Sequence, residues 1–145
     1  MIDTHCHLYS EEFDADREIV IEKAIAEGVK RFFLPAVDRL SYESMEILEK
    51  QNHDNCFALL GLHPCSVKEN FMEEIDFIRS LLRKRKFAGI GETGLDFYWD
   101  RTFMKQQYRA LEIQIELALE YKLPLILHTR NATQETIDCI KNYKD

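Results

Sequence analysis

Five side chains that could bind a metal ion or a phosphate each follow a short apolar run in the sequence. They are His5, His7, His63, Glu92 and His128. Short continuous apolar runs are typical of strands that are covered on both faces. Side chains just past the carboxyl ends of parallel strands converge on one mouth of an α/β barrel, where such barrels keep their chemistry. The sequence therefore predicts one site that gathers these five side chains.

The first two histidines are separated by a single residue. In an extended backbone His5 and His7 point to the same face, about 7 Å apart along the chain, with Cys6 on the opposite face. Two imidazoles so placed can hold one ion. The alternative is a pair of solvated histidines near the N-terminus, and the apolar residues before Asp3 argue against it.

Composition favours a folded domain and excludes several other classes of protein. Apolar residues make up 46% of the sequence and charged residues 31%, with 5 Gly and 3 Pro, which disfavours disorder. No apolar stretch approaches the roughly 20 residues of a membrane span, and no signal region follows Met1. We therefore expect a cytoplasmic protein without a membrane partner. The four cysteines show no Cys-x-x-Cys spacing, so reduced and mostly buried thiols are expected.

The net charge of -7 disfavours a broad basic surface that would bind nucleic acid. Any phosphate binding must therefore depend on a few local side chains. The one basic cluster, Arg83 to Lys86, closes a predicted helix just before a predicted strand. Cations there complement a helix C-terminus. In an α/β barrel that junction lies on the face opposite the strand ends, so the cluster is interpreted as structural.

Predicted strands and helices alternate five times along the sequence. Strands are expected near 1–5, 31–36, 56–60, 88–92 and 124–128, in that spatial order, and helices near 14–27, 41–51, 72–83, 103–121 and 134–143. Ser41 is expected to cap the second helix and Gly28 to end the first, with a loop over 93–101.

This alternation predicts an α/β fold with a parallel sheet. A closed eight-unit barrel takes about 250 residues, whereas this sequence has 145. We therefore expect a partial TIM (β/α)8 barrel of about five βα units, forming a single domain over residues 1–145.

Several motifs occur together and in order. They are Asp-Thr-His-Cys-His at 3–7, Gly-Leu-His-Pro at 61–64, Gly-Glu-Thr-Gly-Leu-Asp-Phe-Tyr at 91–98, Gln107 with Gln114 and Ala118, and His-Thr-Arg-Asn-Ala at 128–132. With them the sequence resembles the TatD family of metal-dependent deoxyribonucleases, a branch of the amidohydrolase-like barrels. The resemblance covers essentially the whole chain, which would be the N-terminal five-eighths of such a barrel.

The resemblance implies a metal-dependent hydrolase that cleaves phosphodiester bonds of DNA by two-metal activation of water. His5 and His7 would bind one divalent ion, Glu92 would bridge two, and His128 would bind the second. Imidazoles and carboxylates suit Zn²⁺, and Mg²⁺ or Mn²⁺ would also accept the carboxylate. Glu92, His128 and His63 are the expected catalytic residues.

His63 and Arg130 are interpreted as the pair that binds substrate phosphate. An arginine fork matches two phosphate oxygens, and an imidazole can donate one more hydrogen bond. The alternatives are a turn histidine held by Pro64 and a strand-end salt bridge of Arg130. Cys65 lies beside His63 in the sequence, and a metal role for it is not favoured.

Four further residues have open interpretations. Asp96 would support a metal ligand or cap a loop. Tyr98 and Trp99 would stack on a base, since aromatic faces bind unpaired bases without sequence preference, or would pack at the barrel rim. His53 lies in a polar stretch and is expected to be exposed.

The family pattern also calls for a histidine on a sixth strand and an aspartate on an eighth. Without them the second ion would keep only Glu92 and His128 and would bind weakly. We interpret the chain as part of a longer enzyme; a shortened protein completed by a partner is the alternative. Open sheet edges invite pairing, so self-association is expected.

Two other functions stay open at this point. One is a histidinol-phosphatase-like phosphoesterase, which also begins with a His-x-His strand; the motifs at 61–64 and 91–96 argue against it. The other is a catalytically silent barrel fragment that serves as a binding or assembly module.

Overall fold

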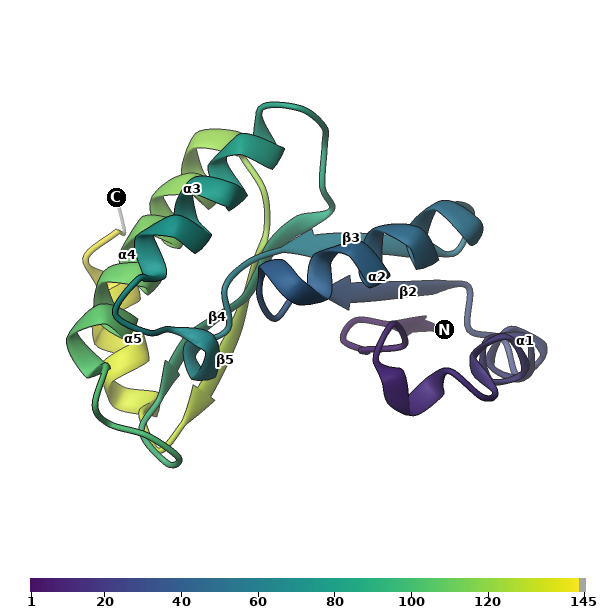
Figure 1. Cartoon of the computed structure of the whole chain (residues 1–145), viewed down its shortest axis with the longest axis horizontal. Coiled ribbons are helices and arrows are strands. Elements are labelled where there is room, and N and C mark those ends of the chain that lie inside the picture. The colour runs from purple at the N-terminus through teal and green to yellow at the C-terminus, as the bar shows by residue number, and fades with distance from the viewer. Residues whose placement is uncertain (144–145) are drawn as a thin grey trace.

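The computed structural model describes residues 1–143, and its centre is a parallel sheet of five strands. The strands are β1 (Ile2–Asp3), β2 (Arg31–Pro35), β3 (Cys56–Leu60), β4 (Gly89–Asp96) and β5 (Leu125–Arg130). Their order in the sheet is β1-β2-β3-β4-β5, and every neighbouring pair is parallel. The predicted α/β fold and strand order are therefore confirmed, as a curled sheet that forms part of a barrel (Figure 1).

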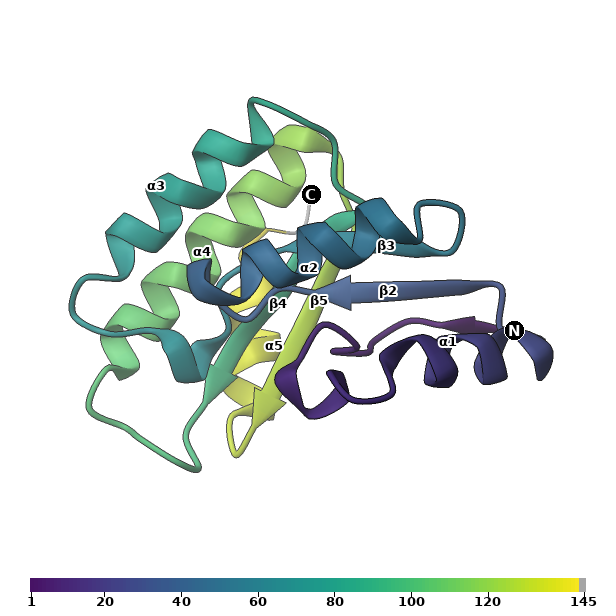
Figure 2. The same cartoon turned by 45° about the vertical axis from the view of Figure 1, so that its right-hand side comes forward.

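Five helices connect and cover the strands. They are α1 (Arg17–Ala26), α2 (Arg39–Gln51), α3 (Phe71–Leu82), α4 (Met104–Tyr121) and α5 (Thr133–Lys141), with short 3-10 turns at Glu11–Phe13 and Pro64–Ser66. Helices α3 and α4 lie side by side in both views (Figures 1 and 2). The core between helices and sheet contains fully buried side chains from both layers, among them Leu34, Ala58, Met45, Ile75 and Ile113.

Strand β4 is longer than the sequence predicted. The expected loop over 93–101 begins only after Asp96, because residues 93–96 pair with 127–130 of β5. Gly94 permits this pairing, since a Cβ at this residue, whose φ is +153°, would overlap the carbonyl oxygen of His128. Polar residues and a glycine made this segment look like a loop, and contacts from α4 hold it as a strand.

Two glutamines of α4 supply these contacts. The Gln107 side chain accepts from the Asp96 N–H at 2.9 Å and donates to the Asp96 carbonyl at 3.2 Å. The Gln114 side chain donates to the Thr93 hydroxyl at 2.6 Å and also binds both backbone groups of Leu62. These buried side-chain amides take the place of backbone hydrogen-bond partners for the groups that they bind.

The start of α2 also differs from the prediction. Asp38, and not Ser41, is the N-cap, and its carboxylate accepts from the Ser41 N–H at 2.9 Å. The Ser41 hydroxyl in turn accepts from the Asp38 N–H at 3.0 Å, which makes a reciprocal capping box. Helix α1 begins at Arg17, three residues later than expected, and Gly28 follows its end with a φ of +95°, as expected for a C-terminal glycine.

The basic cluster at 83–86 lies between α3 and β4, at the amino end of that strand. Arg85 donates to a Glu49 carboxylate oxygen at 2.6 Å and lies 4.0 Å from the centre of the Phe87 ring. In a parallel sheet this end is opposite the strand ends that carry the candidate ligands. The structure therefore agrees with a stabilising role for the cluster.

Candidate metal centre

The carboxyl ends of four strands bring the five predicted side chains together. His5 and His7 follow β1, His63 follows β3, and Glu92 and His128 lie within β4 and β5. They form two groups whose ligand atoms all lie within 4.8 Å of one another, and Glu92 belongs to both groups. The expected convergence is thus present in the structure.

The first group, called here the His5 cluster, consists of His5, His7 and Glu92. The Nε2 atoms of the two histidines are 3.2 Å apart. Oε2 of Glu92 lies 3.0 Å from His5 Nε2 and 3.7 Å from His7 Nε2. Ligands about 2.0–2.1 Å from a tetrahedral Zn²⁺ are about 3.4 Å apart, so the spacing fits one ion.

The second group, called here the His128 cluster, consists of His63, Glu92 and His128. Oε1 of Glu92 lies 2.9 Å from His128 Nδ1 and 3.8 Å from His63 Nε2. The two histidine nitrogens are 3.1 Å apart. One oxygen of Glu92 therefore faces each cluster, as a carboxylate bridging two ions would.

A tyrosine fixes the orientation of His7. The Tyr9 hydroxyl donates to the carbonyl of Pro35 at 2.5 Å and is 2.8 Å from His7 Nδ1. Because its only proton is used, the hydroxyl must accept from His7 Nδ1–H, which leaves the Nε2 lone pair facing Glu92. The sequence analysis missed Tyr9; its position two residues after His7, on the same face of an extended chain, was the available signal.

Asp96 fixes His128 in the same way. One carboxylate oxygen, Oδ2, lies 3.0 Å from His128 Nε2, and the other accepts from the backbone N–H groups of Tyr98 and Trp99. A carboxylate partner of this kind sets the tautomer of a metal-binding histidine and leaves its other nitrogen free. Asp96 therefore caps the loop through Oδ1, as one interpretation expected, and contacts His128, the expected ligand, through Oδ2.

His63 is oriented by the backbone of its own turn. Its Nδ1 accepts from the Cys65 N–H at 3.1 Å, so in the neutral ring the proton is on Nε2. Burial lowers the pKa of His63 to about 4, which keeps the ring neutral at pH 7. His63 therefore presents an N–H to the His128 cluster, whereas His128, with Nε2–H held by Asp96, can offer a lone pair on Nδ1 to an ion.

The electrostatics of the site favour a cation between Glu92 and its neighbours. In the metal-free site a proton lies between Glu92 and the neighbouring rings: burial alone would raise the pKa of Glu92, but hydrogen bonds to His128 and His7 outweigh burial and lower it. The hydrogen bond to Glu92 raises the pKa of His128, despite burial. A lone pair on His128 Nδ1 cannot lie 2.9 Å from a carboxylate oxygen unless a positive charge lies between them. In the metal-free site that charge is a proton; a divalent cation could replace it, because two imidazoles and a carboxylate are suitable donors for one.

Arg130 and two aromatic side chains lie beside the His128 cluster. The guanidinium carbon of Arg130 is 3.9 Å from the ring centre of Tyr98 and 5.0 Å from that of Trp99. Within residues 1–143, no carboxylate lies within salt-bridge distance of Arg130, so the strand-end salt bridge is not formed there. Tyr98 and Trp99 are exposed and pack on each other, outside the core.

The remaining predicted positions, His53 and Cys65, belong to neither of the two clusters. His53 is exposed, as expected, and its nearest charged partner is its neighbour Asp54 at 3.7 Å. The Cys65 thiol contacts Asp96 at 3.4 Å, and burial raises its pKa to about 11. All four cysteines are free thiols, and Cys65 is exposed, whereas Cys56 and Cys139 are buried. Among the described residues, no helix is long and apolar enough to cross a membrane.

Comparison with known families supports the expected resemblance. A family model described as "TatD related DNase" matches residues 2–145. An uncharacterized metal-dependent hydrolase of Bacillus subtilis, YabD, is 37% identical over 142 residues, which cover 97% of this chain and 55% of that protein. A protein of Pantoea ananatis named 3'-5' ssDNA/RNA exonuclease TatD is 33% identical over 132 residues, covering 91% of this chain and 51% of that protein.

The fold has a close counterpart among solved structures. The crystal structure of YjjV, a TatD homolog from Escherichia coli K12, matches with a TM-score of 0.89 and 30% identity, over 99% of this chain and 56% of that one. The chain thus spans about half the length of the relatives it matches.

Proposed function

Because the chain belongs to the TatD related DNase family of metal-dependent hydrolases, we propose that its two histidine–glutamate clusters hold two divalent cations for the cleavage of phosphodiester bonds in DNA or RNA. The observation that carries this proposal is Glu92, whose two oxygens lie 3.0 Å from His5 Nε2 and 2.9 Å from His128 Nδ1. The ions would be Zn²⁺, Mg²⁺ or Mn²⁺, bound at neighbouring positions of the one barrel domain.

Bound divalent ions would supply an activated water and would stabilise the leaving oxygen of the phosphodiester. The residues of the chain would do the rest. Tyr9 and Asp96 hold His7 and His128 in their ligand tautomers, so both rings are oriented before an ion binds. His63 and Arg130 would bind substrate phosphate, through an N–H aimed at the His128 cluster and through a guanidinium without a carboxylate partner in residues 1–143.

A nucleic-acid substrate is supported by several relatives that are named 3'-5' ssDNA/RNA exonucleases. The alternative phosphoesterase function has no such support, because the model of the TatD related DNase family matches residues 2–145. A cytoplasmic location is also part of the proposal, and four free thiols are consistent with a reducing compartment.

The test of the proposal measures metal content and cleavage side by side. Equilibrium dialysis of the chain against Mn²⁺ or Zn²⁺ should give close to two ions per chain, with the His128 cluster binding more weakly. A labelled single-stranded oligonucleotide should then be cleaved with added metal and left intact with EDTA. A silent module would bind no ion at these residues, and that result would contradict the proposed function.

Self-association is a second part of the proposal. Strands β1 and β5 are the edges of the sheet, and Ile2 and Leu127 on them are 51% and 40% exposed. Edges of this kind pair with other chains unless they are covered. We expect light scattering to give a mass above the 17.2 kDa monomer that rises with concentration. Leu127→Lys should lower that mass, because a charge on an edge strand opposes pairing; a monomer at every concentration would contradict this expectation.

A further inference from the structure

Two large aromatic side chains are exposed next to the proposed metal centre. Trp99 is 68% exposed and Tyr98 51%, and their rings meet edge to face with centres 4.8 Å apart. Aromatic side chains of this size leave apolar surface in contact with water, which is unfavourable, and a ligand or partner that covers them would gain the free energy of its burial. The pair therefore marks a binding surface and does not serve the core.

The position of the pair is coupled to the His128 cluster. Oδ1 of Asp96 accepts from the N–H groups of Tyr98 at 2.9 Å and Trp99 at 3.4 Å, while Oδ2 of the same carboxylate lies 3.0 Å from His128 Nε2. One buried side chain thus anchors both the aromatic pair and a proposed metal ligand. A substrate held at His128 would have Tyr98 and Trp99 beside it.

Arg130 contacts the pair and adds positive charge. Its guanidinium lies 3.9 Å from the Tyr98 ring centre and 5.0 Å from the Trp99 ring centre, within the range of cation–π contact. It follows His128 by two residues on β5. A nucleic acid needs a cation for its backbone and a ring face for its bases, and both are present on this surface.

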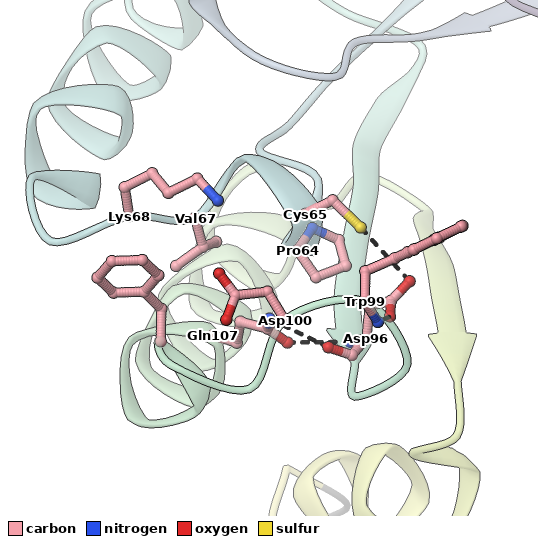
Figure 3. Close-up of a pocket in the computed structure, with 9 residues that line it drawn as sticks. Pro64, Cys65, Val67, Lys68, Asp96, Trp99, Asp100 and Gln107 are labelled. Atoms are coloured by element: carbon pink, nitrogen blue, oxygen red, sulfur yellow. Dashed lines mark hydrogen bonds between the residues drawn. The ribbon is translucent and has the colours of Figure 1, made fainter.

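A small cavity opens beside Trp99 and next to Asp96. It has a volume of about 130 Å³ and is lined by apolar groups of Pro64, Val67 and Phe103; the charged residues in its lining are Lys68, Asp96 and Asp100. Figure 3 shows Lys68 and Trp99 on opposite sides of it, with Asp100 between them. An apolar cavity of about 150 Å³ holds one benzene ring, so this cavity suits a single ring with a polar edge.

We propose that Trp99, with Tyr98 and Arg130, is a stacking surface for unpaired nucleobases of a single-stranded nucleic acid bound at the metal centre. The inference rests on the proposed nuclease function and names the part of the substrate that this surface recognises. Bases in a duplex are already stacked and cannot lie on Trp99, so the surface selects single strands. Lys68 and Asp100 offer a donor and an acceptor to the edge of such a base.

The chain contains one tryptophan, so its fluorescence reports on Trp99 alone. The first experiment titrates the chain with a single-stranded thymidine oligonucleotide and with an abasic oligonucleotide that has the same backbone and length. EDTA prevents cleavage during the titration. Only the base-bearing strand should quench the fluorescence strongly. Equal quenching by both strands, or none, would overturn the stacking proposal.

The second experiment measures cleavage by variants. Trp99→Ala should raise KM for the base-bearing oligonucleotide by about tenfold, the size expected for loss of one base stack, with little change in kcat. Trp99→Tyr should restore most of the affinity. Leu119→Ala removes an exposed apolar side chain in the last turn of α4, far from the strand ends, and serves as the matched control.

The outcomes separate the two proposals. A Trp99→Ala variant that keeps the parent's preference for base-bearing over abasic strands would overturn stacking while cleavage itself still supports the nuclease. Base-dependent quenching without metal-dependent cleavage would support stacking and contradict the nuclease.

Discussion

Replacement of Glu92 by glutamine is expected to abolish paired metal binding and to lower phosphodiester cleavage by orders of magnitude. Both oxygens of this buried carboxylate are in use, with Oε2 facing His5 and His7 and Oε1 facing His128. An amide offers one oxygen and one NH₂ group, so at least one cluster would face a donor where it needs an acceptor. Glu92→Gln also removes the negative charge that holds two cations close together.

Matched variants show whether Glu92 serves both clusters. His5→Ala should remove the ion of the His5 cluster only, and His128→Ala that of the His128 cluster only, whereas Glu92→Gln should affect both. Metal content by dialysis and cleavage of a single-stranded oligonucleotide are the measurements. A glutamine variant that binds metal and cleaves as well as the parent would show that Glu92 is a structural strand-end residue.

A thermal melt in EDTA tests the structural side of the same substitution. The pKa of Glu92 is lowered in the fold, so its charge stabilises the metal-free protein above the ordinary glutamate pKa of about 4.3. The pKa of His128 is raised, so its contribution is complete below the ordinary histidine value of about 6.5 and is lost as pH rises further. Glu92→Gln should therefore lower the melting temperature most between these two pH values.

The strand order and the convergence of the candidate ligands could be predicted because both depend on local patterns. Short apolar runs mark covered strands, and the residue after each run lies at the same end of a parallel sheet. This logic placed His5, His63, Glu92 and His128 together although up to 123 positions separate them in the chain.

Features that depend on contacts between distant elements could not be predicted from local pattern. Residues 93–96 look like a loop until Gln107 and Gln114 of α4 supply hydrogen bonds to them. Likewise, the Tyr9 hydroxyl accepts from His7 only because the Pro35 carbonyl of β2 takes its proton. Such partners are set by the packing of whole elements.

The contacts of Arg130, on the proposed substrate side of the site, also could not be predicted from local sequence pattern. The motif at 128–132 led to the interpretation that Arg130 binds phosphate, and nothing in it indicates that the guanidinium of this β5 residue contacts Tyr98 and Trp99 in the loop after β4. The aromatic contact orients the arginine and leaves its N–H groups at the surface, so one side chain can serve both phosphate and base.

Removal of the His63 side chain is expected to lower cleavage by about 10²- to 10³-fold, the effect of deleting one hydrogen-bond donor to a developing negative charge. Metal content should not change. The reason is the tautomer: Nδ1 accepts from the Cys65 N–H, and the neutral ring therefore carries its proton on Nε2, which is 3.8 Å from Glu92 Oε1. A nitrogen that carries a proton cannot bind a cation, but it can donate to a phosphate oxygen.

A pair of substitutions separates donation from metal binding. His63→Gln places an amide NH₂ near the position of Nε2 and should recover part of the activity that His63→Ala loses, with the metal content of both variants equal to that of the parent. His128→Ala is the control for a proposed ligand, because its Nε2 is held by Asp96 and its Nδ1 faces Glu92 at 2.9 Å, where an ion would replace the shared proton. If His63→Ala loses an ion as His128→Ala does, then the hydrogen bond from the Cys65 N–H to His63 is lost when metal binds. In that case His63 is a third ligand of the His128 cluster. Metal content therefore decides between a ligand and a substrate-binding donor, whatever the size of the loss in cleavage.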